Sequence, residues 1–201
     1  MSVQFSRPND GCCTAGRSVF AAEAALILTC SCDLVRLGRQ AGSLMQKITP
    51  FLWFDNQAED AMKFYTSIFK KSRIGRVTRY GDAGPGPKGA VMSATFELDG
   101  QEFMALNGGP LFKFSPAVSF YVNCKTQKEV DELWAKLSAG GKTERCGWLT
   151  DKFGLSWQII PSILGKLLHD KDPAKSQRVM KAMLQMNKLD IDGLKRAHAG
   201  K

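Results

Sequence analysis

The sequence predicts an α+β fold in which two βαβββ units form a curled mixed sheet and helices follow at the C-terminus. Three observations predict it. Segments with the alternation of strands and segments with helical spacing follow one another in the order β-α-β-β-β, twice. Matching positions of the two halves lie at constant sequence offsets, which marks an internal repeat. A unit whose sheet is open on one face must also bury that face against another layer, so the units are expected to pack together.

The first unit is expected over residues 46–109. Its helix carries Glu59 and Asp60 in the first turn, where the helix dipole favours acidic residues. Its last two strands are joined by Asp99-Gly100, a strong hairpin signal. The expected elements are a strand, a helix and three strands at residues 48–54, 58–69, 73–80, 90–98 and 102–107.

The second unit is expected over residues 117–161. Its helix has Thr126 at the N-cap, Glu129 three residues later, and a Gly-Gly pair at its end. Adding 69 maps Phe51 to Phe120 at the start of the repeat, and adding 54 maps Phe103 to Trp157 at its end. The expected elements are a strand, a helix and two strands at residues 117–124, 126–141, 142–149 and 155–160, with room for one more short strand between the last two.

The 44 residues before the repeat differ from the rest in composition. They contain four Arg, no Lys and four of the six Cys, whose spacings match no zinc site. We expect this leader to be disordered or to lie before the natural start, with the regular domain running over 45–161. Residues 162–201 are expected to form a helical extension with an apolar stripe at Met180, Met183, Leu184 and Met186.

The charge and composition of the chain limit the classes of partner that we expect. The net charge is +9, and the last forty residues hold nine Lys and Arg against four Asp and Glu. Such a distribution indicates a solvated basic helix face, so we expect no nucleic-acid partner. No apolar run reaches the roughly twenty residues of a membrane span, and we expect no membrane partner. Without the leader only two Cys remain, which favours a reduced, cytoplasmic setting.

Several long segments resemble a known family. They include "PFLWFDNQAEDAMKFYTSIF", "FELDGQEFMALNGGPLFKF", "EVDELWAKLSAGG", "CGWLTDKFGLSWQIIP" and the tail "DPAKSQRVMKAMLQMNKLDIDGL". Together they are similar to the PhnB-like branch of the vicinal oxygen chelate superfamily, which includes glyoxalases, bleomycin-resistance proteins and extradiol dioxygenases. The resemblance implies the glyoxalase/bleomycin-resistance fold. It does not fix a function, because the superfamily hosts several chemistries and some pure binders.

The resemblance also locates the metal-ligand positions of the superfamily, which hold His, Glu or Gln in its metal-dependent members. Carried onto this chain, the positions are Ile48 and Met104 in the first unit, and Ala117 and Gln158 in the second. An alkyl group offers no lone pair, and one amide oxygen cannot hold a divalent ion. We therefore expect no metal and no other cofactor.

Gln158 is then left as a polar group in an aromatic cup for a small molecule. The alternative for each aromatic residue alone is a place in the ordinary core. The amides of Asn107 and Gln158 support the hypothesis of a ligand site, because a buried amide needs a hydrogen-bond partner. The residues expected to contact the ligand are Trp53, Asn107, Phe120, Trp148, Asp151, Trp157 and Gln158.

Two functions stay open. One is a metal-free binding module. The other is an isomerase, lyase or transferase in which a substrate oxygen meets Asn107, Asp151 or Gln158. Proteins of this branch are often named 3-demethylubiquinone-9 3-methyltransferase. The sequence, however, has no Gly-rich turn between a strand and a helix of the kind that commonly binds S-adenosylmethionine.

A homodimer is the expected assembly. Open sheet edges are a liability that a second chain can close. The C-terminal helices are expected either to brace that interface or cross to the partner, or to cover the chain's own sheet.

Overall fold

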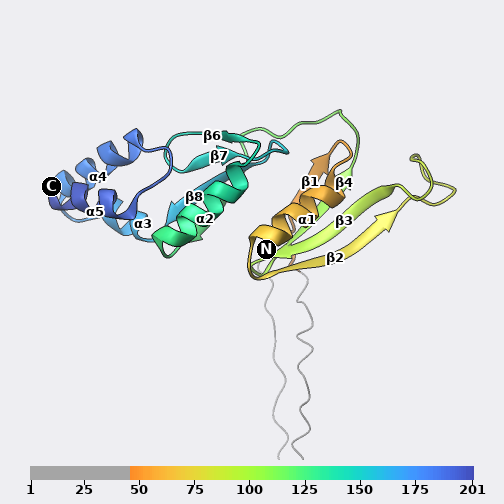
Figure 1. The fold of residues 1–201 in the computed structure, drawn as a ribbon, viewed down its shortest axis with the longest axis horizontal. Helices are drawn as coiled ribbons and strands as arrows, with labels where there is room; N and C mark the ends of the chain where they lie inside the picture. The colour runs from red at the N-terminus through yellow and green to blue at the C-terminus, as the bar shows by residue number, and fades with distance from the viewer. Residues whose placement is uncertain (1–45) are drawn as a thin grey trace, which may run out of the picture. The chain divides into compact units, whose positions relative to one another are not determined.

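Two four-stranded mixed sheets, each with a helix on one face, form the framework of the protein (Figure 1). The structure is a computed structural model and describes residues 46–201, so the predictions for the leader lie outside the described residues. Residues 45–201 form one compact unit. The predicted α+β fold with two βαβββ units is confirmed, and the two sheets do not close into one barrel.

The first unit has the strand order β1-β4-β3-β2. Strand β1 runs parallel to β4, and the other neighbours are antiparallel. Asp99 and Gly100 form the predicted hairpin turn with positive φ angles of 47° and 87°. Its elements are β1 (Phe51–Phe54), α1 (Ala58–Ile68), β2 (Ser72–Arg79), β3 (Val91–Leu98) and β4 (Gln101–Asn107).

The second unit repeats this topology with the order β5-β8-β7-β6 and a parallel β5–β8 pair. The Thr126 side chain caps the helix by accepting a hydrogen bond from the Glu129 N–H. The Glu129 carboxylate accepts one from the Lys125 N–H. The cap signal is thus confirmed. The elements are β5 (Ser119–Cys124), α2 (Gln127–Ser138), β6 (Lys142–Thr143), β7 (Trp148–Thr150) and β8 (Ser156–Pro161).

The single strand predicted over 142–149 is wrong. The chain turns between β6 and β7, where Cys146 and Gly147 take left-handed φ angles of 60° and 83°. Their N–H groups donate to Met186 and Asn187 of the C-terminal extension, so neither N–H extends a strand ladder here. The predicted segment is therefore divided into β6 and β7, which begins at Trp148, and no further strand lies between β7 and β8 in this described part of the chain.

The repeat is shifted by one residue in its first strand. Phe51 lies opposite Met104 in the first sheet, and Tyr121 lies opposite Gln158 in the second. Since Met104 and Gln158 are equivalent, Phe51 corresponds to Tyr121, an offset of 70 and not the predicted 69. A slip of one residue moves every side chain of a strand to the opposite face. Phe120 is therefore not the equivalent of Phe51.

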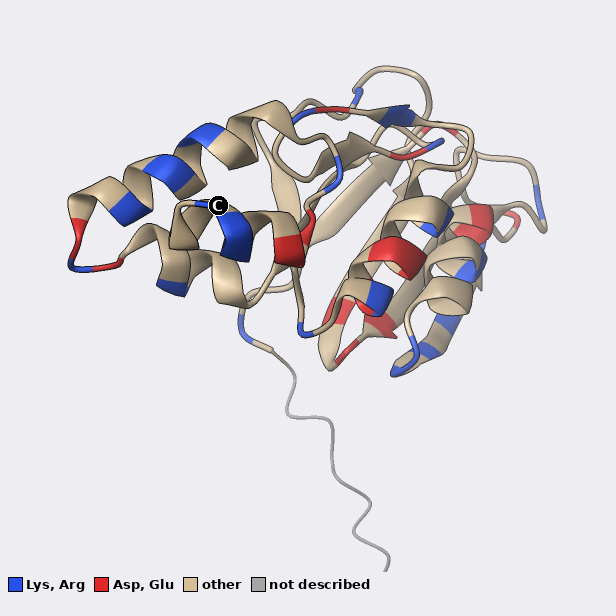
Figure 2. Ribbon diagram, turned by 60° about the vertical axis from the view of Figure 1, so that its left-hand side comes forward, with Lys and Arg blue, Asp and Glu red and all other residues tan. Residues whose placement is uncertain are grey.

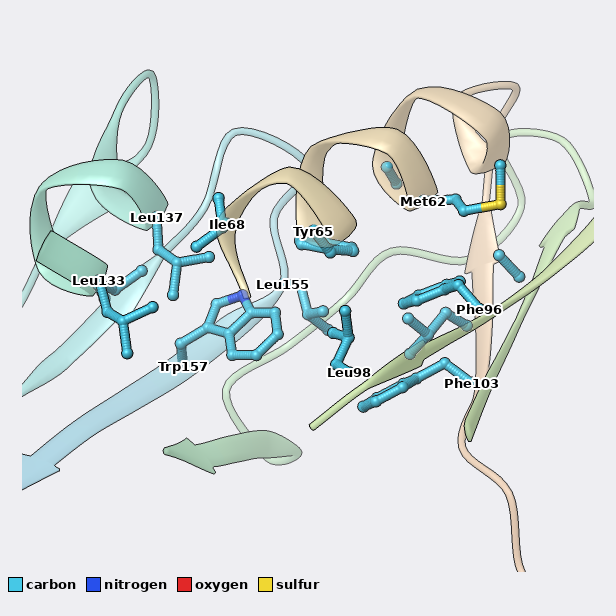
Figure 3. Close-up of a cluster of buried hydrophobic side chains, with 14 of the residues drawn as sticks. Met62, Tyr65, Ile68, Phe96, Leu98, Phe103, Leu133, Leu137, Leu155 and Trp157 are labelled. Atoms are coloured by element: carbon cyan, nitrogen blue, oxygen red, sulfur yellow. The ribbon is translucent and has the colours of Figure 1, made fainter. Parts of the chain in front are cut away.

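The helices and the sheets enclose one main core. Helices α1 and α2 pack on their sheets, and buried residues from both units belong to the same cluster (Figures 1 and 3). Tyr65 of α1 contacts Trp157 of β8, with ring centroids 5.4 Å apart. The ring centroids of Phe103 in the first unit and Phe120 in the second lie 5.1 Å apart. These contacts join the two halves through their helix-covered faces.

The C-terminal extension packs on the chain's own second unit. Its helices are α3 (Ile163–Leu168), α4 (Pro173–Gln185) and α5 (Ile191–Ala199). The Asp172 side chain caps α4. The predicted apolar stripe is wrong as a single face. Met183 and Met186 pack with the buried Val179, whereas Met180 and Leu184 are exposed, because they lie about a quarter-turn away.

Charge is unevenly spread over the described part of the chain. Figure 2 shows Lys and Arg along the C-terminal helices, and both signs on α1. Within residues 46–201, no helix has the length and apolar character to cross a membrane.

Candidate functional site

Asp151 lies at the junction of the two units and is 3% exposed. Its Oδ2 accepts hydrogen bonds from the Tyr65 hydroxyl and the Trp157 indole N–H, both at 2.8 Å. Its Oδ1 accepts from the backbone N–H groups of Phe153 and Leu155, at 2.9 and 3.1 Å. Four donors compensate for the loss of water around this carboxylate. The carboxylate is therefore engaged in holding α1 against the β7–β8 loop.

Tyr65 is the partner that the sequence did not reveal. It is completely buried between the two units (Figure 3). Burial, and secondarily the negative charge of Asp151, raises the pKa of the Tyr65 phenol well above its usual value. The hydroxyl thus remains a hydrogen-bond donor at physiological pH.

Asn107 is likewise engaged by the fold. Its Oδ1 accepts from the Ala58 N–H at 2.8 Å, and its Nδ2 donates to the Val91 carbonyl at 3.0 Å. Gln57 at the N-cap makes no side-chain capping bond. Asn107, at the end of β4, instead accepts a hydrogen bond from an otherwise unpaired N–H in the first turn of α1. This amide ties the helix to β3.

The other predicted aromatic residues lie on two different sheet faces. Phe120 and Trp157 are neighbours on the helix-covered face of the second sheet. Trp53 lies opposite Leu106 on the other face of the first sheet. Its indole donates to the Gly109 carbonyl at 2.9 Å, and its ring meets Phe112 edge-on at 5.0 Å. The structure does not gather the seven predicted residues in one cup.

Gln158 and Trp148 do lie together, on the open face of the second sheet. Gln158 is the direct cross-strand neighbour of Trp148 in β7 and of Tyr121 in β5. Side chains paired in register share a face, so the three form one row. The Gln158 Nε2 donates to the Ser119 hydroxyl at 2.9 Å, which fixes the amide and directs its carbonyl oxygen away from Ser119. Tyr121 is 59% exposed.

The first sheet has an equivalent row of Phe51, Met104 and Thr95. Phe51 is 53% exposed. Both rows are uncharged. Sequence reasoning missed Tyr121, because the offset of 69 paired Phe51 with Phe120 and so assigned β5 to the wrong face. Phe51 was not named, although it shares a face with the predicted Trp53. A test of both offsets against the alternation of each strand would have found Tyr121.

Of the ligand positions implied by the resemblance, only Gln158 carries a side-chain oxygen that could bind a metal ion. Ile48 and Ala117 precede β1 and β5, which begin at residues 51 and 119. Met104 and Gln158 lie on β4 and β8. Within residues 46–201, no three His, Cys, Asp or Glu side chains are grouped to hold a metal ion. The residues present do not fit the superfamily's divalent metal.

A hollow of about 620 Å³ lies between the start of α1, the loop that joins β2 to β3, and the end of β4, and it is lined by Glu59, Tyr80 and Asn107 among others. Glu59 is paired with Lys63 at 2.8 Å and Arg79 at 3.2 Å. The hydrogen bond from Lys63 is the main reason why the pKa of Glu59 is lowered. The charge of Glu59 is thus already balanced by two ion pairs. The open sheet faces are therefore a stronger candidate for the functional site than this hollow.

The two βαβββ units have the order of elements that the resemblance to the glyoxalase/bleomycin-resistance fold implies. The chain belongs to the PhnB-like family described as 3-demethylubiquinone-9 3-methyltransferase, whose family model matches residues 46–160. No curated protein is significantly similar to it.

Three solved structures illustrate the similarity. The PhnB protein from Bacillus cereus is 44% identical, and the match covers 58% of this chain and 99% of that one, with a TM-score of 0.54. A protein from Staphylococcus aureus is 36% identical over 56% of this chain and 93% of that one, with a TM-score of 0.27. A glyoxylase/bleomycin resistance protein/dioxygenase domain from Frankia sp. is 14% identical over 58% and 92%, with a TM-score of 0.40.

Proposed function

We propose that this protein binds a small, uncharged, flat molecule on the open faces of its sheets, without a metal ion. The observation that carries the proposal is the row of Tyr121, Gln158 and Trp148 in direct register on one face. Aromatic surface with a few oriented polar groups is how small-molecule sites are built. The fixed amide of Gln158 offers its carbonyl oxygen to a donor on the ligand.

The ligand class follows from the chemistry of the two rows. The central positions are Tyr121, Gln158 and Trp148 in one sheet and Phe51 and Met104 in the other, all uncharged. None of these side chains could form an ion pair with a charged ligand group to compensate for its lost hydration. An aromatic or conjugated molecule with a hydroxyl or amine donor suits the site best.

Binding is favoured over catalysis because the candidate catalytic side chains other than Gln158 either hold the fold together or are unreactive. Asp151 and Asn107, the other candidates to meet a substrate oxygen, are engaged in holding the fold. Burial raises the pKa of the Cys124 thiol to about 12, so it is a poor nucleophile. Cys124 and Cys146 are free thiols, as suits a reducing compartment such as the cytoplasm.

A second copy of the chain would complete the cup. Large apolar side chains are exposed along β1, β5 and the segments next to them, a pattern typical of surfaces that become buried on association. They are Ile48, Phe51, Leu111, Phe112, Val118 and Tyr121. Strands β1 and β5 are also the edge strands of their sheets. We therefore propose a homodimer, which light scattering at micromolar concentration tests.

The function is tested by a thermal-shift screen of metabolites with the purified protein, alongside elemental analysis and thermal shifts with divalent metals. The proposal expects stabilisation by uncharged aromatic compounds, no stoichiometric metal, and loss of the ligand shift in Gln158→Ala. A stoichiometric metal that Gln158→Ala releases would contradict it. So would a ligand shift that this variant leaves unchanged.

A further inference from the structure

The turn between β6 and β7 holds an unusual backbone. Cys146 has a φ of 60°, and Gly147 has a φ of 83°. Glycine adopts this region without cost, whereas a cysteine there is strained and persists only if its surroundings hold it. The position just after this turn is Trp148, at one end of the row proposed to bind the ligand.

The contacts that hold the turn come from the C-terminal extension. The Cys146 N–H donates to the Met186 carbonyl at 2.7 Å, and the Gly147 N–H donates to the Asn187 carbonyl at 2.8 Å. The Cys146 thiol lies 3.7 Å from the Met183 carbonyl. The three acceptors belong to the last turn of α4 and to the two residues that follow it. The N–H groups of both left-handed residues are thus satisfied by the extension.

The extension is itself anchored beside the turn. A Cβ on Gly147 would lie 3.3 Å from Cδ1 of Leu189, so this buried side chain packs directly on the turn. The Gln127 side chain at the start of α2 donates to the Leu189 carbonyl at 3.2 Å and accepts from the Ile191 N–H at 2.8 Å. One glutamine therefore fixes the chain on both sides of Asp190.

The hydrogen-bonded turn fixes the backbone position of Trp148 at the start of β7. The Glu144 N–H donates to the Trp148 carbonyl at 2.8 Å, and the Trp148 N–H donates to the Arg145 carbonyl at 3.2 Å. The Gly147 carbonyl accepts from the Ile159 N–H at 2.8 Å, which fixes β7 against β8 beside Gln158. A change at Cys146 or Gly147 would thus be transmitted to Trp148 through adjacent backbone.

We propose that the C-terminal helices are a positioning element of the open-face site: by holding the Cys146–Gly147 turn they orient Trp148 beside Gln158. The family model ends at residue 160, so this control comes from residues beyond the family match. This inference rests on the proposed function only in assigning Trp148 to a ligand site. The link between the C-terminal helices and the position of Trp148 exists in the ligand-free protein.

The test uses the full chain labelled with 5-fluorotryptophan, with the fluorine signals of Trp148 and Trp53 assigned by single Trp→Phe variants. Gln127→Ala removes the two hydrogen bonds that hold the chain on both sides of Asp190, and it leaves the buried apolar core intact. Lys128→Ala, at an exposed neighbouring position, is the matched control. Leu189→Ala is a second, stronger variant. Amide exchange of Cys146 and Gly147 reports on the turn.

In Gln127→Ala we expect these two amides to exchange about five- to tenfold faster, as local opening becomes easier. The Trp148 signal should shift or broaden, while the Trp53 signal, in the other sheet, stays unchanged. Lys128→Ala should alter neither. Faster amide exchange with an unchanged Trp148 signal would overturn the proposal, as would unchanged exchange. Because no ligand is present, a failure here is separate from a failure of the proposed binding function.

Discussion

Replacing Tyr65 with Phe tests how firmly Asp151 joins the two units. The variant removes only the hydroxyl, which donates to the Asp151 carboxylate at 2.8 Å. The carboxylate is 3% exposed and Tyr65 is fully buried, so water has little access to replace the lost donor. Hydrogen bonds to charged groups contribute about 1.5–3 kcal/mol, and we expect the free energy of unfolding to fall by about 2 kcal/mol.

Urea unfolding followed by circular dichroism measures this loss. We expect a lower midpoint with an unchanged slope, because the surface exposed on unfolding stays the same. Tyr121→Phe is the matched control. That side chain is 59% exposed, and its change should stay within about 0.5 kcal/mol. A Tyr65→Phe loss no larger than that of the control would refute the idea that Asp151 depends on this donor.

The same variant should change the response to alkali. The folded-state pKa of Tyr65 lies well above its ordinary value of 10.0, through burial and then the Asp151 charge. Stability from this group is therefore fully present below about pH 10 and is lost as pH rises from there toward the folded-state pKa. Tyr65→Phe should unfold less steeply with alkali than the parent protein, a difference that urea midpoints across this range would reveal.

Three further outcomes are expected. Gly147→Ala should lower the free energy of unfolding by about 1–3 kcal/mol in urea, because φ is positive and the new Cβ would lie 2.8 Å from the Ile159 carbonyl oxygen; a neutral result would mean that the turn can shift freely. Thr126→Ala should cost about 1 kcal/mol by the same assay, through loss of the helix cap, and no measurable loss would contradict that role. The Asp172 N–H and then His198 lower the pKa of Asp170, so its contribution is present above its ordinary pKa of 3.8 and is lost as pH falls below it. Asp170→Asn should reduce the acid dependence of the melting temperature; an unchanged acid profile would count against the pairing.

The repeat, the hairpin at Asp99-Gly100 and the cap at Thr126 could be predicted because their signals are local. Alternation, turn residues and capping residues act within a few positions of one another. The fold class followed from the order of these elements and from their repetition. None of these predictions required the geometry of a long-range contact.

The candidate site was harder to predict, because faces and partners depend on register. A difference of one residue in the connection between strand and helix separated Trp53 from Phe120 and left Tyr121 unnoticed. The role of Asp151 depends on Tyr65, which lies 86 positions away in the sequence. Nothing local to Cys146 indicates a left-handed backbone, since the C-terminal extension supplies the hydrogen bonds that hold it.

The central claim is that a ligand lies against Tyr121, Gln158 and Trp148. Ligand-observed NMR with a library of uncharged aromatic fragments tests it most directly, with the parent protein compared with Gln158→Ala and Tyr121→Ala. The account predicts fragments that bind the parent and lose at least about tenfold in affinity in both variants, while Lys128→Ala retains them. Fragments that bind all four proteins equally would contradict it.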